Sequence, residues 1–199
     1  MSTPRASAAM AATRSGAQAR VRTVRAETLD GRTEWLRLAD PAWNDPLDPT
    51  YAPVIGARWT PVEGPPTLYF NADVVTARAN VRRLCEGYSM LPEDIDDENG
   101  YVLVAARLPA PLQVADAHTE AGLAALGLPV TYPVGDDGAA VGRAVCQPIG
   151  RRIFDEGLDG VHCRSAATPD GSGRELGWFP RAGSRARRRG TRRFGDWYW

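Results

Sequence analysis

The chain has 199 residues, of which 43% are hydrophobic, and its 24 basic and 24 acidic residues leave no net charge. This length suits one domain of about 150 residues with tails, which can bury about 68–70% of the surface of its unfolded chain. The composition argues against a disordered chain, and because no stretch approaches 18 consecutive apolar residues, it excludes a membrane-spanning helix.

Cysteine usage indicates neither disulfides nor a cysteine zinc site. Cys85, Cys146 and Cys163 are odd in number and widely spaced, and no Cys-x-x-Cys pair occurs. A disulfide framework and a zinc site both require closer or paired cysteines. A reducing cytoplasm is the simplest interpretation, so we predict a cytoplasmic protein without a bound metal.

Both ends of the chain are basic, and the acidic residues lie between Glu27 and Glu175, apart from Asp196. Residues 1–26 contain no acid and no continuous apolar run, which predicts a disordered basic tail and not a secretory signal. An organellar transit peptide has a similar composition and stays open as an alternative. We place one folded domain at residues 27–180 and an Arg-rich tail with an aromatic end at residues 181–199.

The first predicted strand covers residues 33–38, where the side chains alternate. Trp35 and Arg37 fall on one side of this strand, and Leu36 and Leu38 fall on the other. Residues 40–53 then hold four prolines, three aspartates and an asparagine. We therefore expect a long irregular loop that leads to Arg58.

A strand and a helix follow this loop. Thr67–Phe70 is a β-branched and aromatic run bounded by Pro-Pro and Asn, which predicts a strand. Asn71 is predicted to cap the next helix, with Asp73 in its first turn, and Gly87 is predicted to end it. Apolar residues recur at helical spacing on this helix, and Asn80 flanks that apolar face, where a pocket can reach a polar side chain.

The rest of the chain shows further strand and helix patterns that do not alternate strictly. An acidic run at residues 91–100 lacks the glycine and glutamate that a calcium loop requires, so a solvated loop is expected. Pro148 is expected to divide a helical stretch, because proline suits the first turn of a helix and not its interior. The expected strands are residues 101–108, 112–115, 160–165 and 175–179, and the expected helices are residues 116–126, 139–146 and 148–156. This pattern predicts an α+β fold, with a mixed sheet flanked by helices.

Several short motifs carry a family resemblance. Arg58-Trp59 precedes the strand with Leu68-Tyr69, and the next helix contains Ala77-Arg78-Ala79. Three further motifs follow downstream: Gln147-Pro-Ile-Gly150, Gly157-Leu-Asp-Gly160 and Arg164-Ser165-Ala166. In this order and spacing the motifs resemble the RES domain, over roughly Trp35 to Pro180. That family is named for Arg, Glu and Ser positions; its members are NAD-degrading toxins of bacterial toxin–antitoxin pairs, and its fold resembles that of ADP-ribosyltransferases.

The resemblance implies that NAD is a substrate, not a cofactor, and that its nicotinamide–ribose bond is cleaved by phosphorolysis or hydrolysis. It also implies that Arg58, Tyr69 and Ser165 line the NAD site, and we assign Arg58, Tyr69 and Asn80 to catalysis. Bidentate recognition of phosphate suits Arg37 as well as Arg58. The tyrosine ring is expected to stack on nicotinamide or ribose, and the serine hydroxyl to hydrogen-bond ribose or amide.

One position departs from the family pattern. Asn80 stands where the family has a glutamate, eleven residues after the strand tyrosine. An amide can hydrogen-bond the ribose hydroxyls but cannot offset the positive charge on the ribose, and a loss of roughly 1–2 kcal/mol costs about tenfold in rate. Glu86 falls near the opposite face of the helix, whereas Glu63 in the loop is an alternative source of charge. If the chain is a weakened enzyme, an Asn80→Glu variant is expected to gain activity.

Three interpretations stay open. The chain is an NAD-cleaving toxin held inactive by an antitoxin protein, a non-enzymatic RES-like binding module, or a protein ADP-ribosyltransferase. Contact between the Arg-rich tail and nucleic acid is less favoured than a solvated basic stretch whose aromatic end packs on the domain. His118 and His162 are expected to be structural, because no partners stand at metal-ligand spacing in the sequence.

Overall fold

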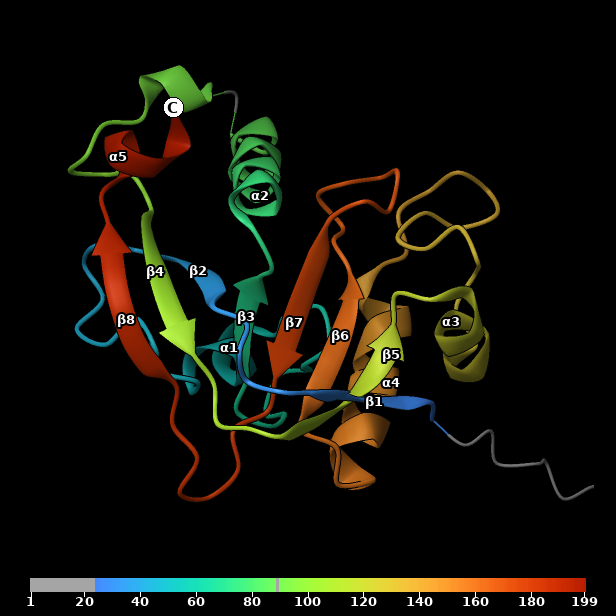
Figure 1. Cartoon of the computed structure of the whole chain (residues 1–199). Helices are drawn as coiled ribbons and strands as arrows, with labels where there is room; N and C mark the ends of the chain where they lie inside the picture. Colours follow the sequence, from blue (N-terminus) through green and yellow to red (C-terminus); the bar gives the residue numbers. More distant parts are fainter. Residues whose placement is uncertain (1–23, 89) are drawn as a thin grey trace, which may run out of the picture.

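A computed structural model of the chain describes residues 24–88 and 90–199. Within them, eight strands form one sheet in the order β1-β5-β6-β7-β3-β2-β4-β8 (Figure 1). The strands are β1 (Ala26–Leu29), β2 (Trp35–Ala39), β3 (Leu68–Asn71), β4 (Val102–Arg107), β5 (Leu112–Ala117), β6 (Gly160–Arg164), β7 (Arg174–Trp178) and β8 (Arg187–Arg192). Neighbouring strands run antiparallel except for β5 and β6, which are parallel. The predicted α+β fold with a mixed sheet is confirmed.

Five α-helices accompany the sheet in the described part of the chain. They are α1 (Tyr51–Ile55), α2 (Val74–Glu86), α3 (Glu120–Leu126), α4 (Arg143–Asp155) and α5 (Phe194–Tyr198), and a 3-10 turn covers Pro92–Asp94. α2 packs against β2 and β3, α3 against β5, and α4 against β6. None of the helices in these residues is long and apolar enough to cross a membrane.

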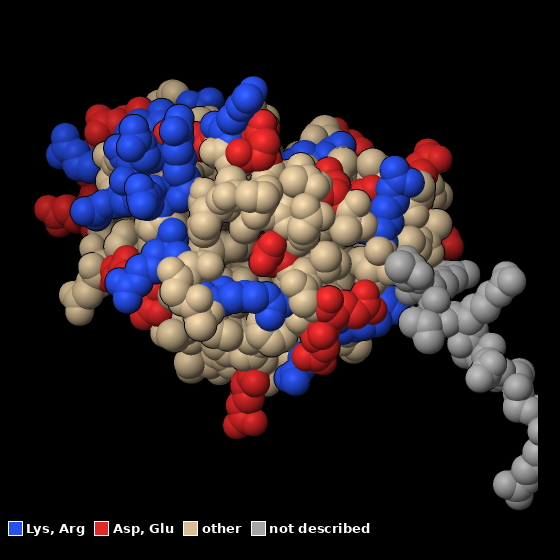
Figure 2. Space-filling view, turned by 60° about the horizontal axis from the view of Figure 1, so that its bottom comes forward, with Lys and Arg blue, Asp and Glu red and all other residues tan. Residues whose placement is uncertain are grey.

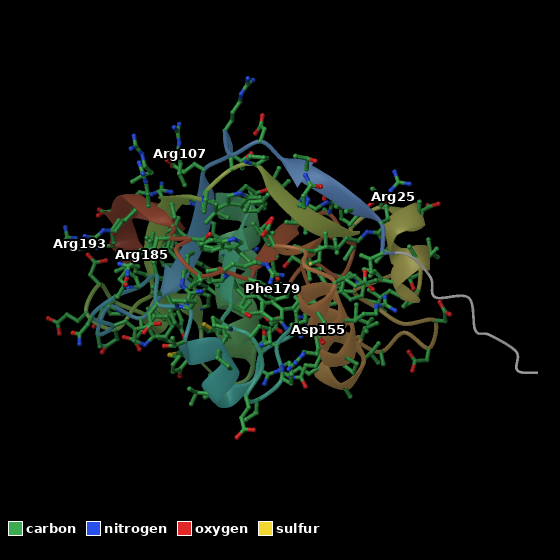
Figure 3. All side chains as sticks on the ribbon, turned by 90° about the horizontal axis from the view of Figure 1, so that it is seen from below. Arg25, Arg107, Asp155, Phe179, Arg185 and Arg193 are labelled. Atoms are coloured by element: carbon green, nitrogen blue, oxygen red, sulfur yellow. The ribbon has the colours of Figure 1, made fainter. Side chains whose placement is uncertain are left out.

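The sheet is strongly curled, and its two faces bury different residues. One buried cluster joins Trp35 of β2, Phe70 of β3, Val114 of β5 and Trp178 of β7. β2 and β5 are not neighbours in the sheet, so their side chains meet only because the sheet bends around this inner face. The outer face packs against α3 and α4, and Figure 3 shows Phe179 beside α4 in that layer.

α2 begins two residues later than the predicted cap implies. Its N-cap is Asp73, whose side chain accepts a hydrogen bond from the backbone N–H of Thr76. Asn71 instead ends β3 and is buried, and its side-chain amide donates to the carbonyl of Leu36. An aspartate with extended backbone is a strong N-cap, so the helix begins at the first position that satisfies its free N–H groups. The helix ends at Glu86, before Gly87, as predicted.

Two further helix boundaries differ from the predictions. α4 is a single helix that contains Pro148, because the residues around the proline, including Cys146 and Ile153, are buried on the core side and hold both halves together. α3 starts at Glu120 with Thr119 as its N-cap. Asp116, the predicted cap, belongs to β5 and accepts hydrogen bonds from the turn that leads to α3.

The segment predicted as an Arg-rich tail is part of the fold. β8 pairs with β4 as the outermost strand of the sheet, and each of its six residues is exposed. Basic side chains gather on this side of the molecule (Figure 2, upper left). α5 then buries Phe194, Trp197 and Tyr198, and Arg78 of α2 donates to carbonyls at the end of the chain. At the other end, residues 1–23 lie outside the described residues, and Ala26 already belongs to β1.

Candidate functional site

A cavity of about 310 Å³ lies where α2, β3 and β7 meet the loop before β3. Its lining consists of Ala57, Arg58, Tyr69, Asn80, Arg83, Leu84, Arg143, Ala166 and Glu175. Arg58, Tyr69 and Asn80, which the sequence singled out, therefore share one cavity although they come from a loop, a strand and a helix. This volume is within the range of about 300–1,000 Å³ found for ligand sites.

α4 fixes the loop that carries Arg58. Gln147 donates through Nε2 to the carbonyl of Ala57 at 2.9 Å. Gly150, three residues farther on, lets the helix approach so closely that a Cβ there would lie 1.9 Å from the carbonyl oxygen of Trp59. The Gln-Pro-Ile-Gly motif thus holds the backbone of the residues on either side of Arg58 in place.

Arg58 presents a charged guanidinium to the cavity. One of its nitrogens donates to the carbonyl of Val141 at 2.8 Å, which fixes the side chain. Burial alone would lower the pKa of Arg58, but the buried Tyr132 and Cys146 and the carboxylate of Glu175 together raise that pKa above its ordinary value. The group therefore stays positive at every physiological pH.

Tyr69 offers its ring to the cavity while its hydroxyl is engaged elsewhere. The hydroxyl accepts a hydrogen bond from the backbone N–H of Trp59 at 2.9 Å and lies 3.5 Å from the hydroxyl of Thr60. Burial raises the pKa of Tyr69 to about 12, so the phenol is neutral. Tyr69 anchors the arginine loop, and its ring is the part that can meet a ligand.

A carboxylate that no sequence motif indicated also lines the cavity. Glu175 of β7 is half-buried, and its Oε1 accepts from Asn80 Nδ2 at 2.7 Å and from Ser165 Oγ at 2.5 Å. Asn80 Nδ2 also donates to Asn71 Oδ1 at 2.8 Å. Asn80 and Glu175 are 95 residues apart, so only the fold brings them together.

The position of Glu175 follows from strand register. Glu175 lies opposite Cys163 in β6 and opposite Asn71 in β3, and paired residues of neighbouring strands share a face. The pairs Cys163–Glu175 and Arg164–Arg174 centre the β6–β7 hairpin on residue 169. The glycines at 171 and 173 would instead suggest a turn centred on residue 172, and a count outward from there places Glu175 opposite residue 169. Local sequence spacing therefore does not bring Glu175 to Ser165.

Ser165 is fully buried and supports Glu175. Its hydroxyl donates to Glu175 and accepts from the backbone N–H of Ala167 at 3.1 Å. It is not among the residues that line the cavity. The geometry makes Ser165 a positioning residue for the carboxylate, whereas the family resemblance implied direct contact with ribose or amide.

A second cavity of about 690 Å³ adjoins the first, and Arg83 and Ala166 line both. Arg82 adds a second cation to its wall, and Glu86 adds a carboxylate. Arg83 also donates to the carbonyl of Ala166, which ties α2 to the segment after β6. The two cavities share part of their lining, and together they are lined by four arginines: Arg58, Arg82, Arg83 and Arg143.

Arg37 lies outside this site. Leu36 pairs with Asn71, so Leu36 shares the face of Asn71 and Tyr69, and Arg37 must point to the opposite face of the sheet. Its guanidinium donates to the carbonyls of Pro46 at 2.7 Å and Tyr69 at 3.2 Å, and burial lowers its pKa to about 10. Arg37 holds the loop of residues 40–50 against the sheet, and it does not line the cavity that Arg58, Tyr69 and Asn80 share.

Comparisons with known proteins identify the family of this chain. A search among curated proteins finds no match. Among solved structures, the fold is similar to a chain in the crystal structure of the M. tuberculosis MbcT–MbcA toxin–antitoxin complex, with a TM-score of 0.67 and 22% sequence identity over 86% of this chain and 91% of that chain. The family model of the RES domain matches residues 25–195. The chain therefore belongs to the RES domain family.

Proposed function

We propose that this RES-domain chain is a toxin-like enzyme that binds NAD and cleaves its nicotinamide–ribose bond, with phosphate or water as the acceptor. The observation that carries the proposal is the carboxylate of Glu175, which is hydrogen-bonded to Asn80 and lines the same cavity as Arg58 and Tyr69. A carboxylate at this place supplies the negative charge that an asparagine at position 80 lacks.

The chemistry requires such a charge. When the bond between nicotinamide and ribose breaks, the ribose acquires the character of an oxocarbenium cation, and nicotinamide leaves as a neutral group. A fixed anion beside the ribose stabilises that transition state more than the ground state, which is the condition for catalysis. Glu175 is held in place by two hydrogen bonds, from Ser165 and Asn80, so little reorganisation is needed when the charge develops.

The other groups suit the rest of the dinucleotide. The ring of Tyr69 offers a face for nicotinamide, and Asn80 retains its amide oxygen as an acceptor for a ribose hydroxyl, because its hydrogen bonds to described residues all use Nδ2. Arg58 and Arg83 supply positive charges for the pyrophosphate. Each guanidinium can bind two phosphate oxygens at once, in a bidentate manner. The adjoining second cavity provides room for the adenosine half.

Nicotinamide release from NAD by the purified full chain tests this proposal. The release is measured by chromatography with and without phosphate, for the wild type, for Glu175→Gln and for Glu156→Gln, an exposed glutamate at the end of α4 as the matched control. We expect Glu175→Gln to lower kcat by about 10²–10³, the effect of removing one preorganised electrostatic group, and the control to leave it unchanged.

Two outcomes count against the proposal, and they are distinct. If the wild type releases no nicotinamide under any acceptor condition, the chain is a binding module or a protein ADP-ribosyltransferase, and transfer of label from adenosine-labelled NAD to protein separates these two. If wild type and Glu175→Gln release nicotinamide at equal rates, the chain is an enzyme but Glu175 does not carry the charge.

We also propose that an antitoxin protein binds this chain and blocks the cavity. The similar solved structure comes from a toxin–antitoxin complex, which supports a partner of this kind. Expression of the chain alone is expected to arrest growth of a bacterial host, and expression of Glu175→Gln is expected not to. Growth arrest by both proteins alike would separate toxicity from this site.

A further inference from the structure

Away from the cavity, two imidazoles and a carboxylate converge on one point. Glu27 Oε1 lies 2.6 Å from His162 Nδ1 and 3.0 Å from His118 Nε2. The three ligand-type atoms all lie within 4.8 Å of one another. These histidines were expected to lack partners, but the partner is 91 and 135 residues away in sequence, a separation that no local spacing rule detects.

The sheet itself assembles this cluster. β1 and β6 flank β5, with Glu27 opposite Val114 and His162 opposite Asp116. Val114 and Asp116 are two residues apart in β5 and share a face, and His118 is the next residue in that series, just beyond the strand. The cluster therefore lies on the face opposite Cys163 and Glu175, so it is separated by the sheet from the proposed NAD site.

The donor set suits a borderline divalent transition metal. Two imidazole nitrogens and one carboxylate oxygen are ligands of zinc sites with three protein ligands and a water. In a tetrahedral site with bonds of about 2.0–2.1 Å, ligand atoms lie about 3.3 Å apart. The observed separations from Glu27 Oε1 are 2.6 Å to His162 Nδ1 and 3.0 Å to His118 Nε2, which are shorter than this by about 0.7 and 0.3 Å. An ion therefore fits if the side chains of Glu27 and His162 move apart by that amount.

The surroundings fix the rings and leave a side open. The edge of Trp35 packs on His162 with ring centroids 5.7 Å apart. Asp116 adds a second carboxylate 3.6 Å from His118 Nε2, although Arg25 pairs with it at 3.4 Å. The side chains of Glu27, His118 and His162 are 31%, 19% and 15% exposed, so an ion can enter and a water can complete its coordination.

We propose that Glu27, His118 and His162 form a site for a zinc-class divalent ion that fastens β1 to β5 and β6. β1 is the outermost strand on its side of the sheet and pairs only with β5 among the described strands. A metal ion bound by residues of β1 and β6 and by His118 just after β5 would hold β1 in place in the sheet. The competing explanation is a metal-free hydrogen-bond cluster in which both imidazoles donate to Glu27.

Metal titration of the full chain without a polyhistidine tag separates the two. After treatment with a chelator, the protein is titrated calorimetrically with Zn²⁺, and with Mg²⁺ as a hard-cation control that prefers oxygen ligands. We expect one Zn²⁺ per chain, no saturable Mg²⁺ binding, and a rise in the thermal unfolding midpoint with Zn²⁺, because the ion binds only the folded state.

Variants assign the site. Glu27→Gln and His162→Asn are each expected to weaken Zn²⁺ binding by at least about 10–100-fold, the loss that even an outer-shell change produces. Glu34→Gln, an exposed glutamate beside β2, serves as the matched control and is expected to bind as the wild type does. Absence of saturable Zn²⁺ binding, or equal binding in wild type and both variants, would overturn the proposal.

A spectroscopic measurement on the unchanged chain covers the case in which a histidine variant fails to fold. Co²⁺ in a tetrahedral site with nitrogen ligands gives strong visible absorption, whereas Co²⁺ bound loosely by water and surface carboxylates absorbs weakly. Strong bands that saturate at one Co²⁺ per chain and vanish on addition of Zn²⁺ are expected. Weak bands only would show an adventitious ion.

Discussion

At the scale of single residues, the hydrogen bond between Asn80 and Glu175 determines which charge position 80 tolerates. Asn80 Nδ2 donates to Glu175 Oε1 at 2.7 Å, so the amide and the carboxylate complement each other. A second carboxylate at position 80 would face the first at hydrogen-bond distance. Two carboxylates that close cannot both stay ionised without repulsion.

Asn80→Glu is therefore expected to lose activity and not to gain it, contrary to what the sequence alone suggested. We expect its free energy of unfolding to fall by about 1–3 kcal/mol, because a satisfied pair becomes a repulsive one. Denaturant unfolding and nicotinamide release measure the two effects.

The exchange variant Asn80→Glu/Glu175→Gln is the control for this prediction. It returns one carboxylate and one amide to the same two positions, with the charge on α2 instead of β7. Recovery of stability and of part of the activity is expected. An Asn80→Glu single variant as stable and active as the wild type would show that the two side chains do not interact in solution.

At the scale of elements, α4 and its close approach to the arginine loop determine the geometry of the site. The approach depends on Gly150, where a Cβ would meet the carbonyl oxygen of Trp59 at 1.9 Å. Gln147 reinforces the contact through its hydrogen bond to Ala57. A change in α4 therefore reaches Arg58 through the backbone.

Gly150→Ala is expected to destabilise the protein by about 1–3 kcal/mol and to lower nicotinamide release, because the helix and the loop must separate. Gly190→Ala is the matched control, since nothing lies within 4 Å of a Cβ built at that exposed position. Thermal unfolding and nicotinamide release check both variants. Equal unfolding midpoints for Gly150→Ala and wild type would contradict the tight contact.

Local sequence patterns predicted most elements, and tertiary contacts explain the rest. The alternation of Trp35 and Arg37 against Leu36 and Leu38 predicted β2, and a strand pattern of this kind depends only on near neighbours. The helix around Pro148 was missed because packing of distant residues outweighs the loss of one helical hydrogen bond.

The site was predictable to the same degree. Arg58, Tyr69 and Asn80 lie within 23 consecutive residues and were identified together. Glu175 was missed because its role depends on which strands are neighbours, and β7 lies between β6 and β3 only in the folded sheet. Arg37 lies on the face of the sheet opposite this cavity, and residue type alone does not show which face of a strand turns toward a cavity.

At the scale of the whole molecule, the buried ionisable groups make the fold sensitive to alkaline pH. Burial raises the pKa of Tyr69 from its ordinary value of 10.0 to about 12, and burial likewise raises the pKa of Tyr132 and Cys163. The folded chain keeps these protons over a range in which the unfolded chain releases them. Stability therefore falls as the pH rises.

We expect the Tyr69 contribution to be fully present below about pH 10 and to be lost progressively as the pH rises to about 12, with a size of about 2–3 kcal/mol. Denaturant unfolding at a series of pH values measures the slope. Tyr69→Phe removes this group and is expected to show a shallower decline, although its stability at neutral pH is lower because Trp59 loses an acceptor. Parallel declines for the two proteins would contradict the assignment.

β8 is one of the two edge strands of the sheet, and its outer row of backbone groups has no partner strand among the described residues. Arg187, Arg188, Arg189 and Arg192 stand along that row and are exposed. If two copies met there to extend their sheets, the guanidinium groups of both would crowd together, and their repulsion would oppose the union. The exposed arginines of β8 thus oppose edge-to-edge aggregation, which an exposed apolar edge strand would promote.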